Sequence, residues 1–157
     1  EPHRAWPMLA SRLLARNRIP YSAANLGVSV AAQRMAVDYA RKRETFGAPL
    51  SSRQAIQWML VDSEIDIRAC RWLVWEAAWK FDSGEDFHKE AAIAKLFSSE
   101  ALGRVVDRAI QIHGGYGVSK ALPLERWYRE ARIRRIGEGP SEIMRMLISR
   151  YLLSQGG

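Results

Sequence analysis

Apolar residues recur along this chain at the spacing of helix faces, and no segment shows the apolar-polar alternation of a strand. The periodicity is clearest in residues 53–81, where a helix would carry two apolar stripes on opposite sides. The first stripe consists of Ile56, Met59, Leu60, Ile67, Cys70, Val74, Ala77, Ala78 and Phe81. The second consists of Trp58, Val61, Ile65, Trp72, Trp75 and Trp79. A bundle core needs only one such stripe, so the second predicts contact with another domain or subunit.

The remaining helices follow from the same pattern. Residues 20–43 are rich in small side chains, which suits close contact with a neighbouring helix. Residues 88–113 are apolar over much of the helix circumference, so we expect the central helix there. Shorter helices are predicted over 123–136 and in the segment that ends near Leu153. The fold class is therefore all-α: an antiparallel four-helix bundle, with up to five helices, formed as a single domain over residues 1–157.

Composition agrees with a globular domain. The 157 residues are 48% hydrophobic, which is enough for a buried core. No apolar run approaches the ~20 residues of a membrane span, and no signal peptide is recognisable, so we expect a cytoplasmic protein, with the mitochondrial matrix or a peroxisome left open. Cys70 is the single cysteine and lies on an apolar stripe, which predicts a buried, inert thiol. The chain begins without Met or an evident helix cap, so we expect it to start within a longer protein.

The net charge of +7 does not predict a nucleic-acid partner. Basic residues are spread along the chain, and no recognition-helix pattern accompanies them. The densest group, which consists of Arg126, Arg129, Arg132, Arg134 and Arg135, would not share one helix face. It is expected to be solvated or to contact a subunit. No metal site is expected either, because His3, His88 and His113 lack ligand spacing and no helix carries a Glu-x-x-His pair.

A candidate catalytic residue lies in the stretch IRRIGEGPSEIMRML, residues 133–147. Glu138 stands between Gly137 and Gly139, and Pro140 follows where a helix can begin. Glycine on both sides allows a sharp turn and close approach of a flat ligand, and the positive end of the next helix lies beside the acid. This pattern suits a catalytic base. On the local sequence alone, a solvated glutamate in an ordinary interhelical turn is the more common explanation of the same residues.

Three loop motifs, taken together, bear on whether Glu138 is a catalytic base or a solvated turn residue. They are RKRETFG at 41–47, QIHGGYG at 111–117 and IGEGPSEIMR at 136–145. In this order and at these intervals they resemble the C-terminal domain of the acyl-CoA dehydrogenase family. The resemblance covers the chain from about Arg18 to Tyr151. It implies a helical-bundle domain at the C-terminal end of a three-domain FAD enzyme, whose N-terminal helical and middle β domains would precede residue 1.

The resemblance assigns one group of residues to FAD. Arg43 matches an arginine that reaches the FAD pyrophosphate of a neighbouring subunit, which agrees with the bidentate binding of phosphate by guanidinium. The full group is Arg43, Thr45, Phe46, Gln54, Gln111, Gly114 and Gly115. Considered without the resemblance, Gln54 and Gln111 are ordinary helix-terminal amides.

The resemblance assigns a second group to the substrate. Glu138 matches the base that removes the α-proton of an acyl-CoA thioester while a hydride passes to flavin. Arg18 matches an arginine near that carboxylate, and Arg18 and Gly139 are assigned to substrate binding. Considered without the resemblance, Arg18 is equally well explained as a solvated arginine at a helix start. An aromatic residue often precedes the base in this family. Gly137 stands there in this chain, which leads us to expect extra space near the substrate.

A second departure follows the base. The family often has a threonine two residues after it, where this chain has Pro140, and Ser141 could supply the missing hydroxyl. The resemblance further implies a homo-oligomer, dimer or tetramer, and an electron-transfer acceptor. The alternative is a non-catalytic interaction module that retains the flavin motifs and uses its tryptophans for assembly.

Overall fold

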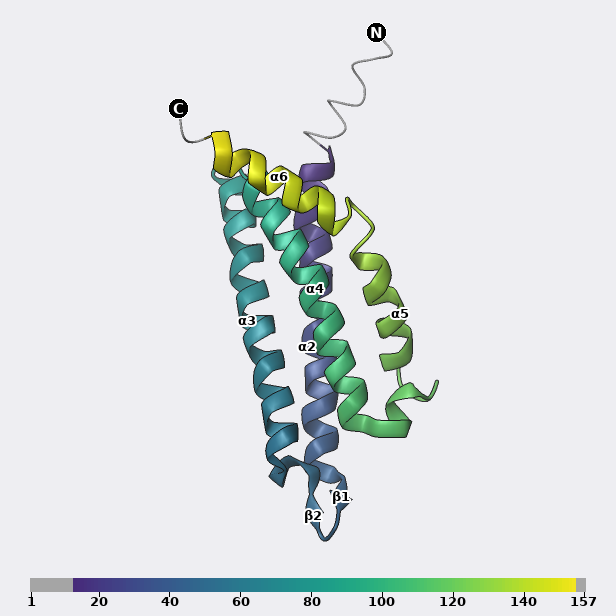
Figure 1. The fold of residues 1–157 in the computed structure, drawn as a ribbon. Coiled ribbons are helices and arrows are strands. Elements are labelled where there is room, and N and C mark those ends of the chain that lie inside the picture. The colour runs from purple at the N-terminus through teal and green to yellow at the C-terminus, as the bar shows by residue number, and fades with distance from the viewer. Residues whose placement is uncertain (1–12, 155–157) are drawn as a thin grey trace.

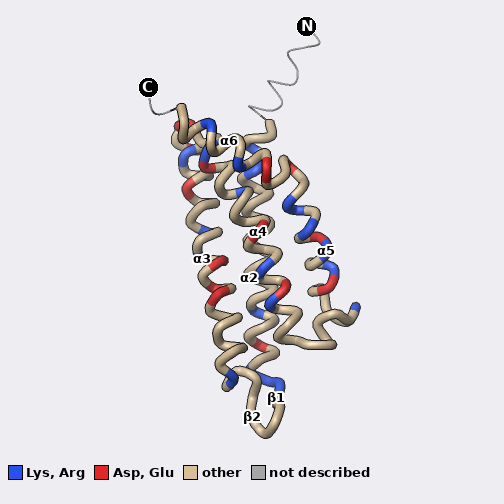
Figure 2. The backbone as a smooth tube through the Cα atoms, viewed as in Figure 1, with Lys and Arg blue, Asp and Glu red and all other residues tan. Residues whose placement is uncertain are grey.

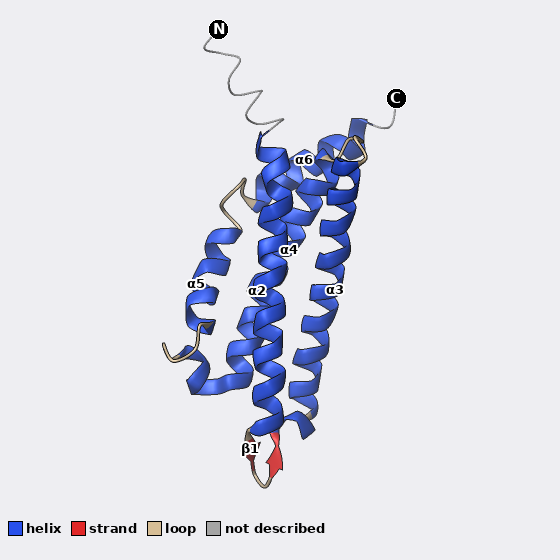
Figure 3. Cartoon of the chain, turned by 180° about the vertical axis from the view of Figure 1, so that it is seen from behind, coloured by secondary structure: helices blue, strands red, loops and turns tan. Residues whose placement is uncertain are grey.

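The computed structural model describes residues 13–154, and its main body consists of three long helices (Figure 1). These are α2 (Ala15–Lys42), α3 (Gln54–Asp82) and α4 (His88–His113). Each runs antiparallel to the one before it, and Figure 3 shows the same arrangement from behind. α4 contacts α2, α3 and both later helices, so it is the central helix, as predicted.

Two shorter helices complete the bundle. α5 (Leu124–Arg134) returns along α4, and α6 (Ser141–Ser154) crosses the end of the bundle at which α2 begins (Figure 1). The connecting elements are β1 (Glu44–Thr45), β2 (Ala48–Pro49) and the 3-10 turns η3 (Leu50–Ser52) and η4 (Gly114–Val118). The predicted all-α bundle with up to five helices is confirmed for the described residues.

The predicted helix boundaries agree with the structure to within a few residues, except at the start of α2. This helix begins at Ala15, whereas the sequence pattern placed its start at Pro20. Pro20 lies inside the helix and removes one backbone hydrogen bond. Residues on either side of it, including Arg18 and Ser22, are buried, so packing continues the helix through the proline.

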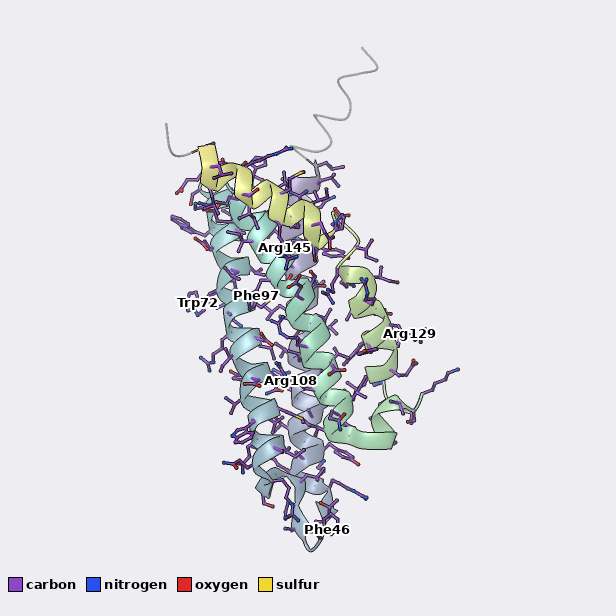
Figure 4. The ribbon with its side chains drawn as sticks, in the orientation of Figure 1. Phe46, Trp72, Phe97, Arg108, Arg129 and Arg145 are labelled. Carbon is purple, nitrogen blue, oxygen red and sulfur yellow. The ribbon has the colours of Figure 1, made fainter. Side chains whose placement is uncertain are left out.

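A small hairpin, absent from the sequence prediction, joins α2 to α3. β1 and β2 pair antiparallel with Thr45 opposite Ala48, which leaves Phe46 and Gly47 as the turn. Both have positive φ, 50° and 74°, as a type I′ turn requires. This conformation is unfavourable for a bulky side chain, yet the Phe46 side chain is 99% exposed at the hairpin tip (Figure 4). Two residue pairs are too short a run to produce a strand pattern in the sequence.

Small residues bring α2 close to its neighbours, as the composition of 20–43 predicted. Apart from Arg18, the buried positions of α2 are Ala15, Ser22, Asn25, Ser29, Ala32, Ala36 and Ala40. Its main partner is α4, and Asn25 Nδ2 donates a hydrogen bond to Ser98 Oγ at 3.2 Å across this contact. Because the buried side chains on the α2 side of this contact are mostly small, groups on α2 and α4 can meet the same neighbouring segment.

The two predicted stripes of α3 differ in their burial. The first contributes Ile67, Cys70, Val74 and Ala77 to the core, although Phe81 at its end is exposed. Burial raises the pKa of Cys70 to about 12, which fits the predicted inert thiol. In the second, hereafter the tryptophan stripe, Trp58, Trp72, Trp75 and Trp79 are 54–67% exposed. Trp72 points away from the bundle in Figure 4, so this chain alone leaves the stripe uncovered.

The charge distribution agrees with the sequence analysis. Basic and acidic residues are scattered over the helices (Figure 2). On α5, Arg129 pairs with Glu125 at 3.0 Å and Arg126 with Glu130 at 3.6 Å, all within one exposed helix. No helix within residues 13–154 is long and apolar enough to cross a membrane, and no group of metal-ligating side chains occurs there.

Candidate functional site

The turn between α5 and α6 carries Glu138 in a strained backbone conformation. Glu138 has φ of 56° and Gly139 has φ of 99°. The left-handed region is uncommon for a residue with a side chain, so surrounding contacts must hold Glu138 there. Backbone hydrogen bonds close the turn: the Gly137 N–H donates to the Ile133 carbonyl at 3.0 Å, and the Ser141 N–H donates to that of Arg135 at 3.1 Å.

Two buried cations reach this turn from different helices. From α2, Nε of Arg18 donates to the Glu138 carbonyl at 3.4 Å. From α4, Nζ of Lys95 donates to the Gly139 carbonyl. Arg18 is 6% exposed and Lys95 0%. The sequence analysis placed Arg18 near the base but missed Lys95.

The burial of Lys95 could have been predicted from its position in the sequence. Lys95 shares one helical face with Ala91, Ser98 and Leu102, and all three are buried. Burial lowers the pKa of Lys95 to about 8, and the charge of Arg18 acts in the same direction. Burial also lowers the pKa of Arg18, while the Glu138 carboxylate partly opposes that change. A lysine within a buried helix face is rare and indicates a specific role.

One oxygen of the Glu138 carboxylate is buried without a partner in the described part of the chain. This atom, Oε2, is shielded from solvent. Removing a carboxylate oxygen from water is costly unless another group binds it. The arrangement therefore presents an oxygen that is available to a ligand or to a proton, on a backbone that cannot easily move.

The space beside Gly137 is filled, so the expectation that this glycine opens the site was wrong for this chain. A Cβ atom at position 137 would lie 2.8 Å from the hydroxyl oxygen of Tyr21 on α2. The Arg134 guanidinium lies 4.9 Å from the centre of the Tyr21 ring. Burial raises the pKa of Tyr21, and interactions with Arg134 oppose this shift. An aromatic side chain thus lies beside the base, but it comes from α2 and could not be inferred from the motif.

Pro140 and Ser141, which follow Gly139, differ in the hydrogen-bonding groups that they present to the site. Pro140 has no N–H to donate, and its carbonyl accepts a hydrogen bond from the Met144 N–H at 3.1 Å. Ser141, the first residue of α6, has a buried Oγ with no partner among the described residues. Its hydroxyl can therefore bind a ligand, which a hydroxyl that replaces the family's threonine would have to do.

The residues that the resemblance assigned to FAD lie at the other end of the bundle. Arg43 follows the last turn of α2, and its side chain is exposed, with no ion pair or hydrogen bond to the described part of the chain. Beside it, the Thr45 carbonyl accepts a hydrogen bond of 2.7 Å from Arg53 Nη2. Gln54 begins α3 and is exposed.

The second FAD motif reaches the same end. Gln111 lies in the last turn of α4, and Gly114 and Gly115 open η4. Gly114 has φ of 59°, and a Cβ added to either glycine would meet no atom within 4 Å. The His113 ring stacks on Tyr39 of α2 with centroids 4.3 Å apart, which ties the ends of the two helices together. A ligand could approach this backbone closely.

The predicted site residues therefore form two separate groups. Arg18 lies near the start of α2 and Arg43 just beyond its end, and the helix has 28 residues. At ~1.5 Å per residue the helix is about 42 Å long. The structure brings Glu138, Gly139 and Arg18 together. Arg43 and the other residues assigned to FAD lie at the opposite end of the bundle.

Comparison with known proteins matches nearly the whole chain to one family. The family model for the acyl-CoA dehydrogenase C-terminal domain matches residues 6–153. The chain belongs to the acyl-CoA dehydrogenase family. A Bacillus subtilis protein named probable acyl-CoA dehydrogenase is 47% identical over 136 residues, which cover 87% of this chain and 36% of that protein.

Solved structures agree with this membership. Butyryl-CoA dehydrogenase from Megasphaera elsdenii has a TM-score of 0.90 and 41% identity, over 92% of this chain and 38% of its own. A structure of PigA with FAD and proline has a TM-score of 0.88 and 27% identity, over 91% of this chain and 37% of its own. The chain thus spans 36–38% of the length of each of these relatives. The resemblance and the bundle fold are confirmed.

The contact between Gly137 and Tyr21 makes a prediction about stability. Gly137→Ala should destabilise the chain by about 1–3 kcal/mol, because the added methyl group meets the Tyr21 hydroxyl in a packed site. Tyr21→Phe should restore most of this loss when the two are combined, since it removes the contacting oxygen. Thermal unfolding of the parent, both single variants and the double variant measures this coupling.

A control is available on α2. Gly27 lies inside that helix, whereas Gly137 lies in a turn, and a Cβ at position 27 would meet nothing within 4 Å, so Gly27→Ala should stabilise the helix by about 0.4–1 kcal/mol. If Gly137→Ala behaves like Gly27→Ala, or if its cost is the same with and without the Tyr21 hydroxyl, the side chains do not compete for this space.

Proposed function

We propose that this chain is the C-terminal helical domain of an FAD-dependent enzyme that oxidises the Cα–Cβ bond of an acyl-CoA thioester, with Glu138 as the base. The observation that carries the proposal is the buried, unpaired Oε2 of Glu138 on a strained turn. The relative named butyryl-CoA dehydrogenase supports an acyl-CoA substrate. An N-terminal helical domain and a middle β domain would supply the rest of the site.

The surroundings of Glu138 suit removal of a proton from carbon. Its Oε2 has no bound partner to lose before it accepts the α-proton. The positive charge of Arg18 is close enough to interact with the Glu138 carboxylate. FAD, when bound, supplies the acceptor for the hydride that leaves the β-carbon. The backbone contacts of the turn limit movement of Glu138 relative to the substrate.

The other end of the bundle fits the phosphate and adenosine part of FAD. The open backbone at Gly114 and Gly115 allows a close approach, and the uncommitted Arg43 guanidinium can bind a pyrophosphate through two parallel hydrogen bonds. The exposed Phe46 ring in its strained turn also suits burial against a ligand or a second chain. The FAD that Arg43 contacts would then belong to the active site of a neighbouring subunit.

Oligomerisation follows from the same arrangement. A second chain would complete the cofactor site and give the tryptophan stripe an apolar partner surface. We propose a homo-oligomer, dimer or tetramer, that passes electrons to a separate acceptor. A non-catalytic module would share the assembly but not the chemistry.

A substitution of Glu138 distinguishes a catalytic domain from a non-catalytic module. In the flavin-loaded enzyme, Glu138→Gln should lower the rate of flavin reduction by acyl-CoA by 10²–10⁴-fold, since an amide cannot accept the proton. Flavin content and acyl-CoA affinity should change little. Stopped-flow absorbance at the flavin band measures this step. Glu130→Gln, the same change at an exposed site on α5, is the matched control and should keep the parental rate. Reduction of Glu138→Gln at the parental rate would place the base elsewhere, and a parent that acyl-CoA does not reduce would favour the non-catalytic module.

Replacing Arg43 tests the cofactor assignment. Arg43→Ala should weaken FAD retention by about 1.5–3 kcal/mol, the scale of a hydrogen bond to a charged group, while the fold survives. Arg43→Lys should recover only part of the loss, because a point charge cannot form the bidentate pair. Flavin occupancy after dialysis measures the effect, with Arg41→Ala in the last turn of α2 as the control. Equal retention by Arg43→Ala and Arg41→Ala would count against the assignment.

Replacing tryptophans tests the interface. Trp72 and Trp75 contact each other edge to face, with ring centroids 5.2 Å apart. Changing both to Gln should shift the protein towards the monomer in sedimentation velocity, because the stripe loses apolar area while the core is untouched. Tyr128→Gln, an exposed aromatic on α5, is the control. A parent that sediments as a monomer with solvated indoles would rule the interface out.

A further inference from the structure

Lys95 is buried without the partner that a buried charge normally requires. Its side chain is 0% exposed, and it forms no salt bridge with any carboxylate in residues 13–154. Its hydrogen bond goes to a neutral acceptor, the Gly139 carbonyl. Removing an ammonium group from water costs several kcal/mol, and one carbonyl does not repay this. Stability alone is therefore a poor reason for a lysine at this position.

The hydrogen bond acts on the strained part of the turn. Lys95 binds the carbonyl of Gly139, and Arg18 binds the carbonyl of the residue before it, Glu138. Both residues have positive φ, and the two cations come from different helices, so they approach the turn from two sides. A buried donor on each of two successive carbonyls limits the rotation of those two peptide groups, with the Lys95 bond the shorter of the two. The two donors can hold a glutamate in a conformation that it would otherwise leave.

We propose that Lys95 is a positioning residue for Glu138: its buried ammonium group, together with Arg18, fixes the backbone of the turn so that the carboxylate keeps the orientation needed for proton removal. This inference rests on the proposed function, and it adds a residue on α4 to the machinery of the site. Lys95 acts through the Gly139 carbonyl and does not contact the substrate.

The charge of Lys95 depends on pH in the physiological range. The groups that influence it are Arg18 from α2, Glu138 in the turn, Glu142 on α6 and Glu100 on α4 itself. Burial and Arg18 lower its pKa to about 8, and the three carboxylates oppose this without cancelling it. The ammonium form is therefore present below about pH 8 and is lost above it. Its loss weakens the hydrogen bond to the turn and removes a positive charge beside Glu138.

The kinetic test uses the flavin-loaded enzyme with butyryl-CoA as the probe. Lys95→Met keeps the length of the side chain but has no charge and no donor. We expect flavin reduction to slow by about 10–100-fold, the effect of misplacing a reacting group by about 1 Å, with flavin content and the spectral shift on acyl-CoA binding unchanged. In the parent the rate should fall as pH rises through about 8, and in Lys95→Met this descending limb should be absent. Lys89→Met, the same change at a half-buried site on α4 where the lysine pairs with Glu90 at 3.5 Å, should match the parent.

Two further readouts do not depend on activity. Amide hydrogen exchange over residues 136–143 should accelerate at least tenfold in Lys95→Met and not in Lys89→Met, while residues 43–50 at the far end stay unchanged.

The second readout is thermal stability. Between pH 8 and 10.5 the folded parent has released the Lys95 proton that the unfolded chain retains, so unfolding must take up a proton. The melting temperature of the parent should therefore rise relative to Lys95→Met across this window.

The outcomes separate the two proposals. Parental flavin reduction, pH profile and exchange in Lys95→Met would overturn the positioning role while leaving Glu138 as the base. A parent that butyryl-CoA does not reduce would count against the proposed function, and the exchange result would still decide whether Lys95 holds the turn. If Lys95→Met fails to fold, Lys95→Gln can replace it, because glutamine keeps a shorter neutral donor. Its rates of flavin reduction and of amide exchange should then lie between the parental rates and those expected for a side chain with no donor. The fall of the parental rate above about pH 8 can be measured without any variant.

Discussion

The close packing of α2 against α4 is the constraint on which the rest of the structure depends. Small residues such as Ala32 and Ala36 on α2 let the two helices approach closely. Arg18 on one helix and Lys95 on the other can therefore reach the same short turn. At the far end, the contact of Tyr39 with His113 keeps the two loop motifs together. A larger side chain in the middle of this interface would move both ends of the bundle.

The sequence was informative wherever local periodicity decided the structure. α4 could be delimited at both ends because apolar residues run from His88 to His113 and glycines follow. The tryptophan stripe could be recognised as a surplus face because a single bundle leaves only one side of α3 buried. The motif spacing identified the family without reference to coordinates. These features depend on residues close in sequence, for which helix geometry gives the relation directly.

The sequence was uninformative wherever two distant segments meet. The side chain over Gly137 comes from Tyr21, and nothing in either local pattern shows that contact. Lys95 could have been noticed as a cation in a buried stripe, but its target, Gly139, is 44 residues away. The hairpin escaped prediction because its turn residue Phe46 contradicts the usual preference for glycine or asparagine. Roles for Glu138, Arg43 and the other predicted site residues stay predictions, since their geometry is consistent with them without demonstrating chemistry.

The two-ended bundle has a genetic consequence. In the proposed dimer, each active site would take its base from one chain and its pyrophosphate-binding arginine from the other, because the two groups lie at opposite ends of α2. A mixed dimer of one chain defective at Glu138 and another defective at Arg43 would then contain one site with both defects and one with neither. Two inactive alleles, expressed together, would restore part of the activity that neither provides alone.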